Sequence, residues 1–152
     1  MKTILVPVDF SPVTPRLMAA AKAFAELGGY RIELLHVAAN GEGWAACSIM
    51  PISVVIPGES SHLHKELRQL KASFAASATA VRTLLIEGGS VSCNILAESE
   101  DIKADTIIIG GHSHRLLSRL LTGSVTSTVV NSAKCRVLVI PNVIQVPLPA
   151  AA

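Results

Sequence analysis

The chain has 152 residues, a length that suits one domain, and half of them are hydrophobic. Aromatic residues make up only 3%, which disfavours a surface that stacks on nucleic-acid bases. Ile, Leu, Val and Ala must therefore fill the core, and this composition favours buried parallel strands. The formal net charge is +2, and no long run of like charges offers a surface to duplex nucleic acid, so we expect no nucleic-acid partner.

The N-terminus, the apolar stretches and the cysteines indicate where in the cell the protein is expected. The N-terminus lacks the pattern of a signal peptide, and no apolar stretch reaches membrane-spanning length. We therefore expect a cytoplasmic protein with no membrane partner. The three cysteines, Cys47, Cys93 and Cys135, are odd in number and include no close pair, so we expect buried or idle thiols rather than a disulfide framework or a zinc knuckle.

The first part of the chain alternates strand and helix patterns. Residues 4–8 form a nearly continuous apolar run, which predicts a strand buried on both faces, and Asp9 follows its carboxyl end. Ser11 and Pro12 predict the N-cap and first residue of a helix that ends at Gly28 and Gly29. A second strand is predicted over residues 30–38. The long loop that follows, residues 40–60, is open to interpretation as a lid, an added strand, an interaction surface or a loop packed on its own domain.

The second part continues the alternation. Apolar residues three and four apart from Leu63 to Val81 predict a long amphipathic helix. Further strands are predicted over 83–86, 105–109 and 136–140, with a less regular helix over about 91–102 between the first two. A short helix is predicted from Ser124 to about Ala133. Residues 1–141 are expected to form the domain, and residues 142–152 a flexible tail.

This alternation predicts an α/β fold with a five-stranded parallel sheet and helices on both faces. In such sheets ligands bind at the carboxyl ends of the strands, where the winding direction reverses. Asp9, Val37 and the loop after Ile109 are all expected on that edge.

The loop after Ile109 is the main candidate for a binding site. It begins Gly110-Gly111-His112-Ser113-His114-Arg115 and ends at Gly123-Ser124-Val125, where a helix is predicted to start. Glycines let a backbone approach a ligand closely, and free N–H groups at a helix start suit an anion. With the Ser113 and Ser124 hydroxyls, Arg115 and Arg119, the loop is a candidate phosphate cradle; an ordinary serine-capped turn is the alternative.

The spacing in this loop resembles the glycine loop of the universal stress protein family. That family's usual form is Gly, two residues, Gly, nine residues, Gly-Ser, and here Ser113 occupies the position of the second glycine. Residues 4–11, 34–37 and 135–141 resemble the family's first, second and fifth strands in the same order. The resemblance covers about residues 1–141.

The resemblance implies a Rossmann-like three-layer sandwich of the adenine nucleotide alpha hydrolase type, with sheet order 3-2-1-4-5. It implies a site for ATP or another adenine nucleotide between the first and fourth strands, with Mg²⁺ arriving on the nucleotide. Asp9 and Val37 would lie near the adenine and ribose, and Gly123, Ser124 and Val125 would bind phosphates. The residues expected to bind nucleotide are Pro7, Val8, Asp9, Ser11, Val37, Ile109, Gly110, Gly111, His112, Ser113, Arg115, Gly123, Ser124 and Val125.

The family resemblance and the apolar strand at residues 137–140 both predict a homodimer through the fifth strand. The leading hypothesis is therefore a stress-response protein that binds nucleotide and signals through its dimer surface, with at most slow ATP hydrolysis. Ser113 supports an alternative, an interaction module of the same fold that no longer holds nucleotide.

Other chemistry fits the sequence less well. No lysine follows a glycine in the Walker spacing, and the segment around Ser113 lacks the second glycine of a hydrolase elbow, so a small hydrolase is a distant alternative. His62 and His64 would point to different helix faces, and His112 and His114 have no carboxylate or cysteine nearby in sequence, so no metal site is expected beyond Mg²⁺. His36, inside a strand, is given no role.

Overall fold

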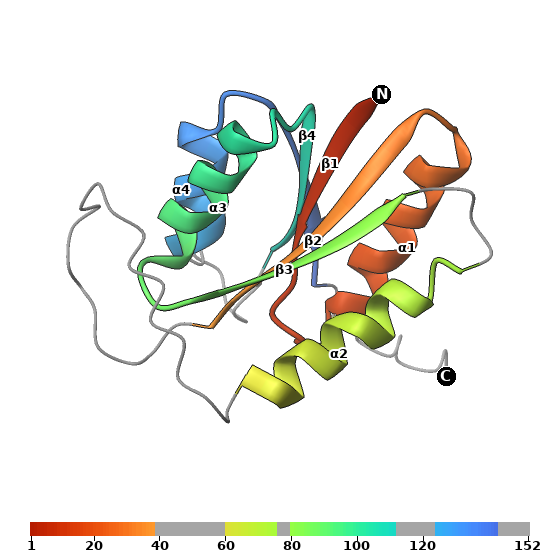
Figure 1. The fold of residues 1–152 in the computed structure, drawn as a ribbon. Coiled ribbons are helices and arrows are strands. Elements are labelled where there is room, and N and C mark those ends of the chain that lie inside the picture. The colour runs from red at the N-terminus through yellow and green to blue at the C-terminus, as the bar shows by residue number, and fades with distance from the viewer. Residues whose placement is uncertain (39–59, 76–79, 112–123, 143–152) are drawn as a thin grey trace, which may run out of the picture.

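The computed structural model describes residues 1–38, 60–75, 80–111 and 124–142. Within these ranges strands and helices alternate along the chain, as the sequence predicts (Figure 1). The elements are β1 (Lys2–Pro7), α1 (Thr14–Glu26), β2 (Tyr30–Ala38), α2 (Ser60–Ala72), β3 (Val81–Glu87), α3 (Val91–Asp101), β4 (Thr106–Gly111), α4 (Ser124–Ser132) and β5 (Arg136–Pro141).

The five strands form one sheet in the order β3-β2-β1-β4-β5, and every pairing is parallel. Helices α1 and α2 cover one face of the sheet, and α3 and α4 cover the other (Figure 1). The chain leaves β1 toward β2 on one side and later returns to add β4 on the other side. This arrangement confirms the predicted three-layer α/β sandwich and its strand order.

The core has two layers, one on each face of the sheet. Successive residues of a strand point to opposite faces, and both Ile4 and Leu5 of β1 are fully buried. Ile4 belongs to the apolar cluster under α1 and α2, whereas Leu5 belongs to the cluster under α3 and α4. A strand covered on both faces needs apolar residues at every position, which explains the continuous apolar run in the sequence.

Helix α1 begins later than predicted. Its N-cap is Val13 and its early proline is Pro15, so the prediction that Ser11 and Pro12 start the helix is wrong. The Ser11 N–H donates instead to Asp9 Oδ1 at 3.0 Å, which keeps these residues in a turn before the helix. The predicted stop is confirmed: Gly28 and Gly29 adopt φ values of 75° and 73°, where residues with a Cβ are strained.

Helix α2 is shorter than the apolar spacing predicts. It ends at Ala72, and Val81 is the first residue of β3, so the predicted helix through Val81 is wrong. Val81 is aligned with Ile32 of β2, and β3 continues beside β2 to Glu87. Pairing with β2 therefore decides the structure of this segment, and β3 is longer than the predicted residues 83–86.

Three other predictions concern the C-terminal tail, the loop over residues 40–60 and the membrane. Of the predicted tail, Asn142 is described, and its N–H donates to Gly111 O at 3.0 Å, which prolongs the contact between β5 and β4. The loop predicted over residues 40–60 lies outside the described residues except at Ser60. In the described ranges no helix is long and apolar enough to cross a membrane.

The cysteines differ from the expectation. Cys93 is disulfide-bonded, so the prediction that it is an idle thiol is wrong. Cys135 is a free, half-buried thiol, and burial raises its pKa.

Candidate functional site

A pocket of about 300 Å³ lies at the carboxyl edge of the sheet, at the switch point between β1 and β4. The aligned residues of β1 and β4 are only Ile4 with Thr106 and Leu5 with Ile107, whereas β1 and β2 stay aligned as far as Pro7. The two central strands therefore separate toward their carboxyl ends. The residues that line the resulting pocket are Pro7, Val8, Asp9, Leu17, Leu35, Val37, Val91, Ile95, Ile109, Gly110, Val125 and Thr126.

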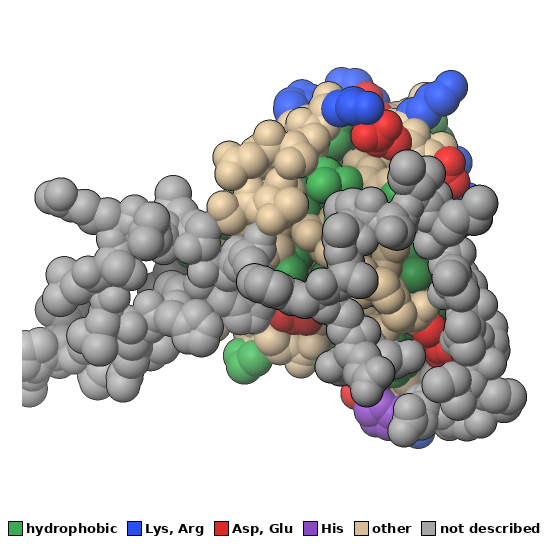
Figure 2. Space-filling model, turned by 90° about the vertical axis from the view of Figure 1, so that its left-hand side faces the viewer, with side chains coloured by type: hydrophobic (Ala, Val, Ile, Leu, Met, Phe, Trp, Pro, Cys, Tyr) green, Lys and Arg blue, Asp and Glu red, His purple; other side chains and the backbone are tan. Residues whose placement is uncertain are grey.

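The described walls of this pocket are mostly apolar. Asp9 supplies an exposed carboxylate, Thr126 supplies a hydroxyl, and no cationic side chain is among the described lining residues. On the face covered by α3 and α4, Lys and Arg side chains gather at the opposite end, near the amino ends of the strands (Figure 2). These walls suit a flat, uncharged group that carries hydrogen-bond donors for Asp9.

The turn after β1 brings Asp9 to the pocket. The Val8 N–H donates to Leu35 O at 2.8 Å, so the contact with β2 continues one residue beyond β1. Phe10 then adopts a φ of 55°, in the left-handed region that residues with a Cβ rarely occupy. His36 reaches this turn from β2: its Nδ1 lies 2.7 Å from Val8 O, and its ring centroid lies 4.6 Å from that of Phe10.

Gly110 has a packing role that the sequence does not reveal. A Cβ built on Gly110 would lie 2.7 Å from Cγ1 of Val13, and the residue does not have a positive φ. The close approach that requires glycine here is therefore that of the residues at the start of α1. On the α4 side, the Thr126 hydroxyl donates to Gly110 O at 2.9 Å and ties the start of α4 to the end of β4.

Seven of the residues predicted to bind nucleotide line the pocket together: Pro7, Val8, Asp9, Val37, Ile109, Gly110 and Val125. They come from the carboxyl ends of β1, β2 and β4 and from the first turn of α4. The sequence therefore predicted residues from four of the segments that meet at this pocket.

Two of the predicted residues are described but do not line the pocket. Ser11 belongs to the turn before α1. Gly111 packs beside β5, where a Cβ built on Gly111 would lie 3.1 Å from Cγ1 of Val139. Ser124 begins α4, but its side chain is outside the described part of the structure. His112, Ser113, His114, Arg115, Arg119 and Gly123 lie outside the described residues.

Five lining residues were missed by the sequence analysis. Leu17, Val91 and Ile95 lie on apolar helix faces and Leu35 in a buried strand, so each has the pattern of an ordinary core residue. Thr126 has no distinguishing pattern beyond its position two residues after Ser124. Residues that serve both core and pocket cannot be separated by periodicity.

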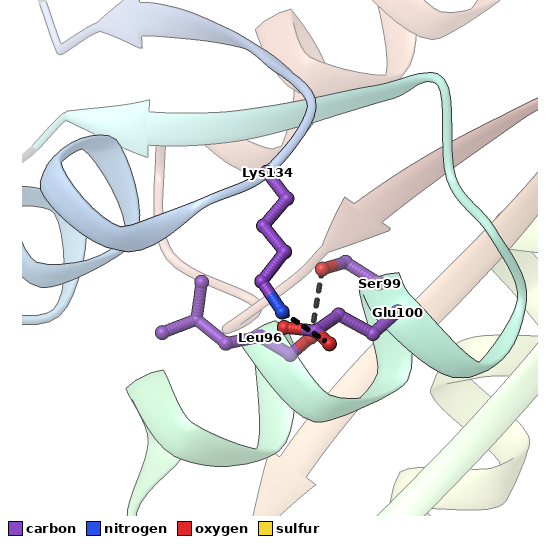
Figure 3. Close-up of polar contacts among 4 residues, drawn as sticks. All are labelled: Leu96, Ser99, Glu100 and Lys134. Carbon is purple, nitrogen blue, oxygen red and sulfur yellow. Dashed lines mark hydrogen bonds and ion pairs between the residues drawn. The ribbon is translucent and has the colours of Figure 1, made fainter.

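A second, shallower pocket of about 260 Å³ lies near the carboxyl ends of α3 and α4. Three of its polar side chains are bonded within the protein: Lys134 Nζ lies 2.9 Å from Glu100 Oε2, and the Ser99 hydroxyl donates to Leu96 O at 2.7 Å (Figure 3). This arrangement is that of a structural contact between α3 and the start of β5. Across the described ranges, no three His, Cys, Asp or Glu residues are grouped to hold a metal ion.

The fold and the pocket define an α/β protein with a cleft at the switch point of its parallel sheet. Residues 1–141 match the universal stress protein family, and the chain belongs to that family. It is 29% identical over 145 residues to universal stress protein G of Salmonella typhimurium, an alignment that covers 91% of this chain and 98% of that protein.

Solved structures show the same fold. A universal stress protein from Lactobacillus plantarum is 26% identical with a TM-score of 0.71, over 91% of this chain and 97% of that one. A universal stress protein in complex with cAMP is 19% identical with a TM-score of 0.68, over 93% and 98% of the two chains. A family protein from Arabidopsis thaliana with AMP bound is 18% identical with a TM-score of 0.63, over 99% and 97%. The last two are similar in fold.

Proposed function

We propose that this universal stress protein binds an adenine nucleotide in the pocket between β1 and β4. The observation that carries the proposal is an apolar cleft at the switch point with a single described carboxylate, Asp9, at its wall. Val37 and Ile109 offer apolar surface to a purine, and Asp9 can accept hydrogen bonds from ribose hydroxyls or an exocyclic amine. The AMP and cAMP complexes of structural neighbours support the same ligand class.

The phosphates would lie on the α4 side of the pocket. Helix α4 begins at Ser124 and contributes Val125 and Thr126 to the wall, so free N–H groups of a helix start are near the cleft. The family resemblance assigns the phosphates to the backbone of residues 110–113 and to Gly123, Ser124 and Val125 at the helix start. ATP would bring Mg²⁺ with it, and Asp9 is the only carboxylate among the described lining residues that could face the ion.

A homodimer through β5 would carry the signal in this proposal. β5 is at the edge of the sheet, and its Leu138 and Val139 are 36% and 39% exposed. An apolar edge strand is a ready surface for a second copy. Nucleotide occupancy would alter the surface that a cytoplasmic dimer offers to protein partners, with ATP hydrolysis slow or absent.

Calorimetry with ATP, AMP and cAMP, with and without Mg²⁺, tests the proposal. We expect micromolar or weaker binding, because the described walls contribute few polar contacts. Asp9→Ala should weaken binding, and Glu26→Ala, an exposed carboxylate at the far end of α1, should serve as the control. Absence of both heat and thermal stabilisation at millimolar nucleotide would contradict the proposal.

The alternative is an interaction module that holds no nucleotide, and Ser113 in place of the family's glycine is the feature that favours it. Ser113→Gly separates the two functions. If the native protein uses nucleotide, the change should alter affinity little. A gain of more than about tenfold, near 1.4 kcal/mol, would show that nucleotide is no longer the normal ligand.

A further inference from the structure

We infer that His36 is a positioning residue for the pocket, because it fixes the turn that holds Asp9 at the pocket wall. The inference rests on the proposed function and identifies a residue, outside the pocket, on which the affinity of that same site depends. His36 is not among the lining residues, although Val37, its neighbour on the opposite face of β2, is. Its effect on a ligand must therefore pass through the turn.

The first link is a hydrogen bond to the main chain. His36 Nδ1 lies 2.7 Å from Val8 O, and since a carbonyl oxygen only accepts, Nδ1 carries the proton and donates. The N–H of Val8 is already bonded to Leu35 O at 2.8 Å. Both polar groups of Val8 are thus held by consecutive residues of β2, one through the main chain and one through the imidazole.

The second link is the contact between the His36 and Phe10 rings. Phe10 has a φ of 55°, and a residue with a Cβ persists in this conformation only where its surroundings hold it there. Its ring lies against His36, with centroids 4.6 Å apart and planes inclined by 39°, and it also packs against the core under α1. The imidazole therefore supports both the carbonyl before Asp9 and the strained residue after it.

Asp9 lies between these two fixed points. Its Oδ1 accepts the Ser11 N–H at 3.0 Å, which closes the turn, while the residue lines the pocket. The contacts to Val8, Phe10 and Ser11 together select one conformation for residues 8–11. When the imidazole is removed, the turn can sample others, and the Asp9 carboxylate is in the binding orientation for less of the time.

Two substitutions separate the two links. His36→Phe keeps a ring for Phe10 but removes the donor to Val8 O, whereas His36→Asn keeps an N–H near the place of Nδ1 but removes the ring. His62→Asn, on the exposed surface of α2, is the matched control. Each variant is titrated with AMP by calorimetry, and hydrogen exchange of the Ser11 amide is measured in the ligand-free protein.

We expect His36→Phe to weaken AMP binding about five- to tenfold, the loss of one hydrogen bond's contribution, and to speed exchange of the Ser11 amide. His36→Asn should recover part of both effects, and His62→Asn should change neither. A role in stability alone would lower the Tm of both His36 variants without this rescue.

The outcomes distinguish this inference from the proposed function. Failure of the native protein to bind AMP, ATP or cAMP would overturn the nucleotide proposal, while faster Ser11 exchange in His36→Phe would still show that His36 positions the turn. Native exchange at Ser11 in His36→Phe would overturn the positioning role, whatever the native protein binds. If His36→Phe does not fold, exchange of the Ser11 amide is measured in His36→Asn, which lacks the ring that contacts Phe10. Native exchange in that variant would overturn the positioning role.

Discussion

The carboxyl group of Glu98 on α3 lies close enough to that of Glu33 on β2 for the two to interact between the helix and the sheet. Burial, and then hydrogen bonding to Glu33 and the charge of Glu33, raise the pKa of Glu98 to about 7 from an ordinary value of 4.5. Glu33 is only 2% exposed, and Arg82 of the adjacent strand β3 lies 4.0 Å from its Oε2. Below about pH 7, Glu98 mostly holds the proton that lets two carboxyl groups lie together.

This pair predicts a protein that loses stability as the pH rises from about 4.5 to about 7. Glu98 retains its proton in the folded state at a pH where the unfolded chain has released it, so the folded state binds more protons between about 4.5 and 7. The stabilisation is fully present below that window and is lost as the pH rises through about 7. Asp101 adds to the repulsion and Arg82 opposes it.

Glu98→Gln tests this prediction, because the amide can donate to Glu33 at any pH. Urea unfolding of the variant should show a flatter pH dependence than the native protein between pH 5 and 8, with higher stability at pH 8. Glu100→Gln, an exposed change on the same helix, should retain the native slope. Identical slopes for the native protein and Glu98→Gln would assign the pH dependence to other groups.

Gly110→Ala should destabilise the protein by overpacking, since the new Cβ would meet Cγ1 of the buried Val13 at 2.7 Å. Inserting a methyl group into a filled core costs typically about 1–3 kcal/mol. Val13→Ala combined with Gly110→Ala should recover part of the loss, because it removes the opposing methyl groups. Additive losses in a double-mutant cycle measured by chemical denaturation would show that the two sites do not contact each other.

Thr126 should contribute to stability through its hydroxyl rather than its methyl group. Thr126→Val preserves the shape but removes the 2.9 Å bond to Gly110 O, and we expect a loss of about 1 kcal/mol. Thr126→Ser keeps the hydroxyl and should be less destabilising. Thermal unfolding of the two variants side by side makes the comparison, and a larger loss for serine would assign the role of Thr126 to packing.

Val139→Lys should convert the proposed dimer to monomers. Val139 is 39% exposed on the edge strand β5, and a charged side chain there would be buried without a partner in a β5 interface. Leu27→Lys, at a 76% exposed position following α1, is the control and should leave the molecular mass unchanged. Light scattering at low protein concentration gives the mass, and a dimeric Val139→Lys protein would move the interface elsewhere.

The sequence predicted the strands and the edge that holds the pocket, because buried parallel strands have long apolar runs. The strand order was predicted by the family resemblance. The sequence mistook the start of α1, where the turn formed by Asp9 and Ser11 precedes the helix, and it extended α2 into residues that pair with β2. Local patterns decide such boundaries poorly, since contacts with distant segments override them.

The site was predicted where it coincides with strand ends and missed where it depends on tertiary contact. Nothing near His36 in the sequence indicates that its ring meets Val8 and Phe10, which are 28 and 26 positions earlier in the chain. Likewise, the packing of Gly110 against Val13 depends on how α1 crosses the sheet.

The separation of β1 from β4 beyond Leu5 and Ile107 has a consequence for how this protein can change over generations. The opening is produced by the route of the backbone, which sends the chain to one side of β1 and later to the other, and the lining side chains decide only what fits inside. Substitutions at Val37, Val91 or Val125 can therefore alter ligand preference without closing the cleft. Recognition can diversify while the architecture is inherited unchanged.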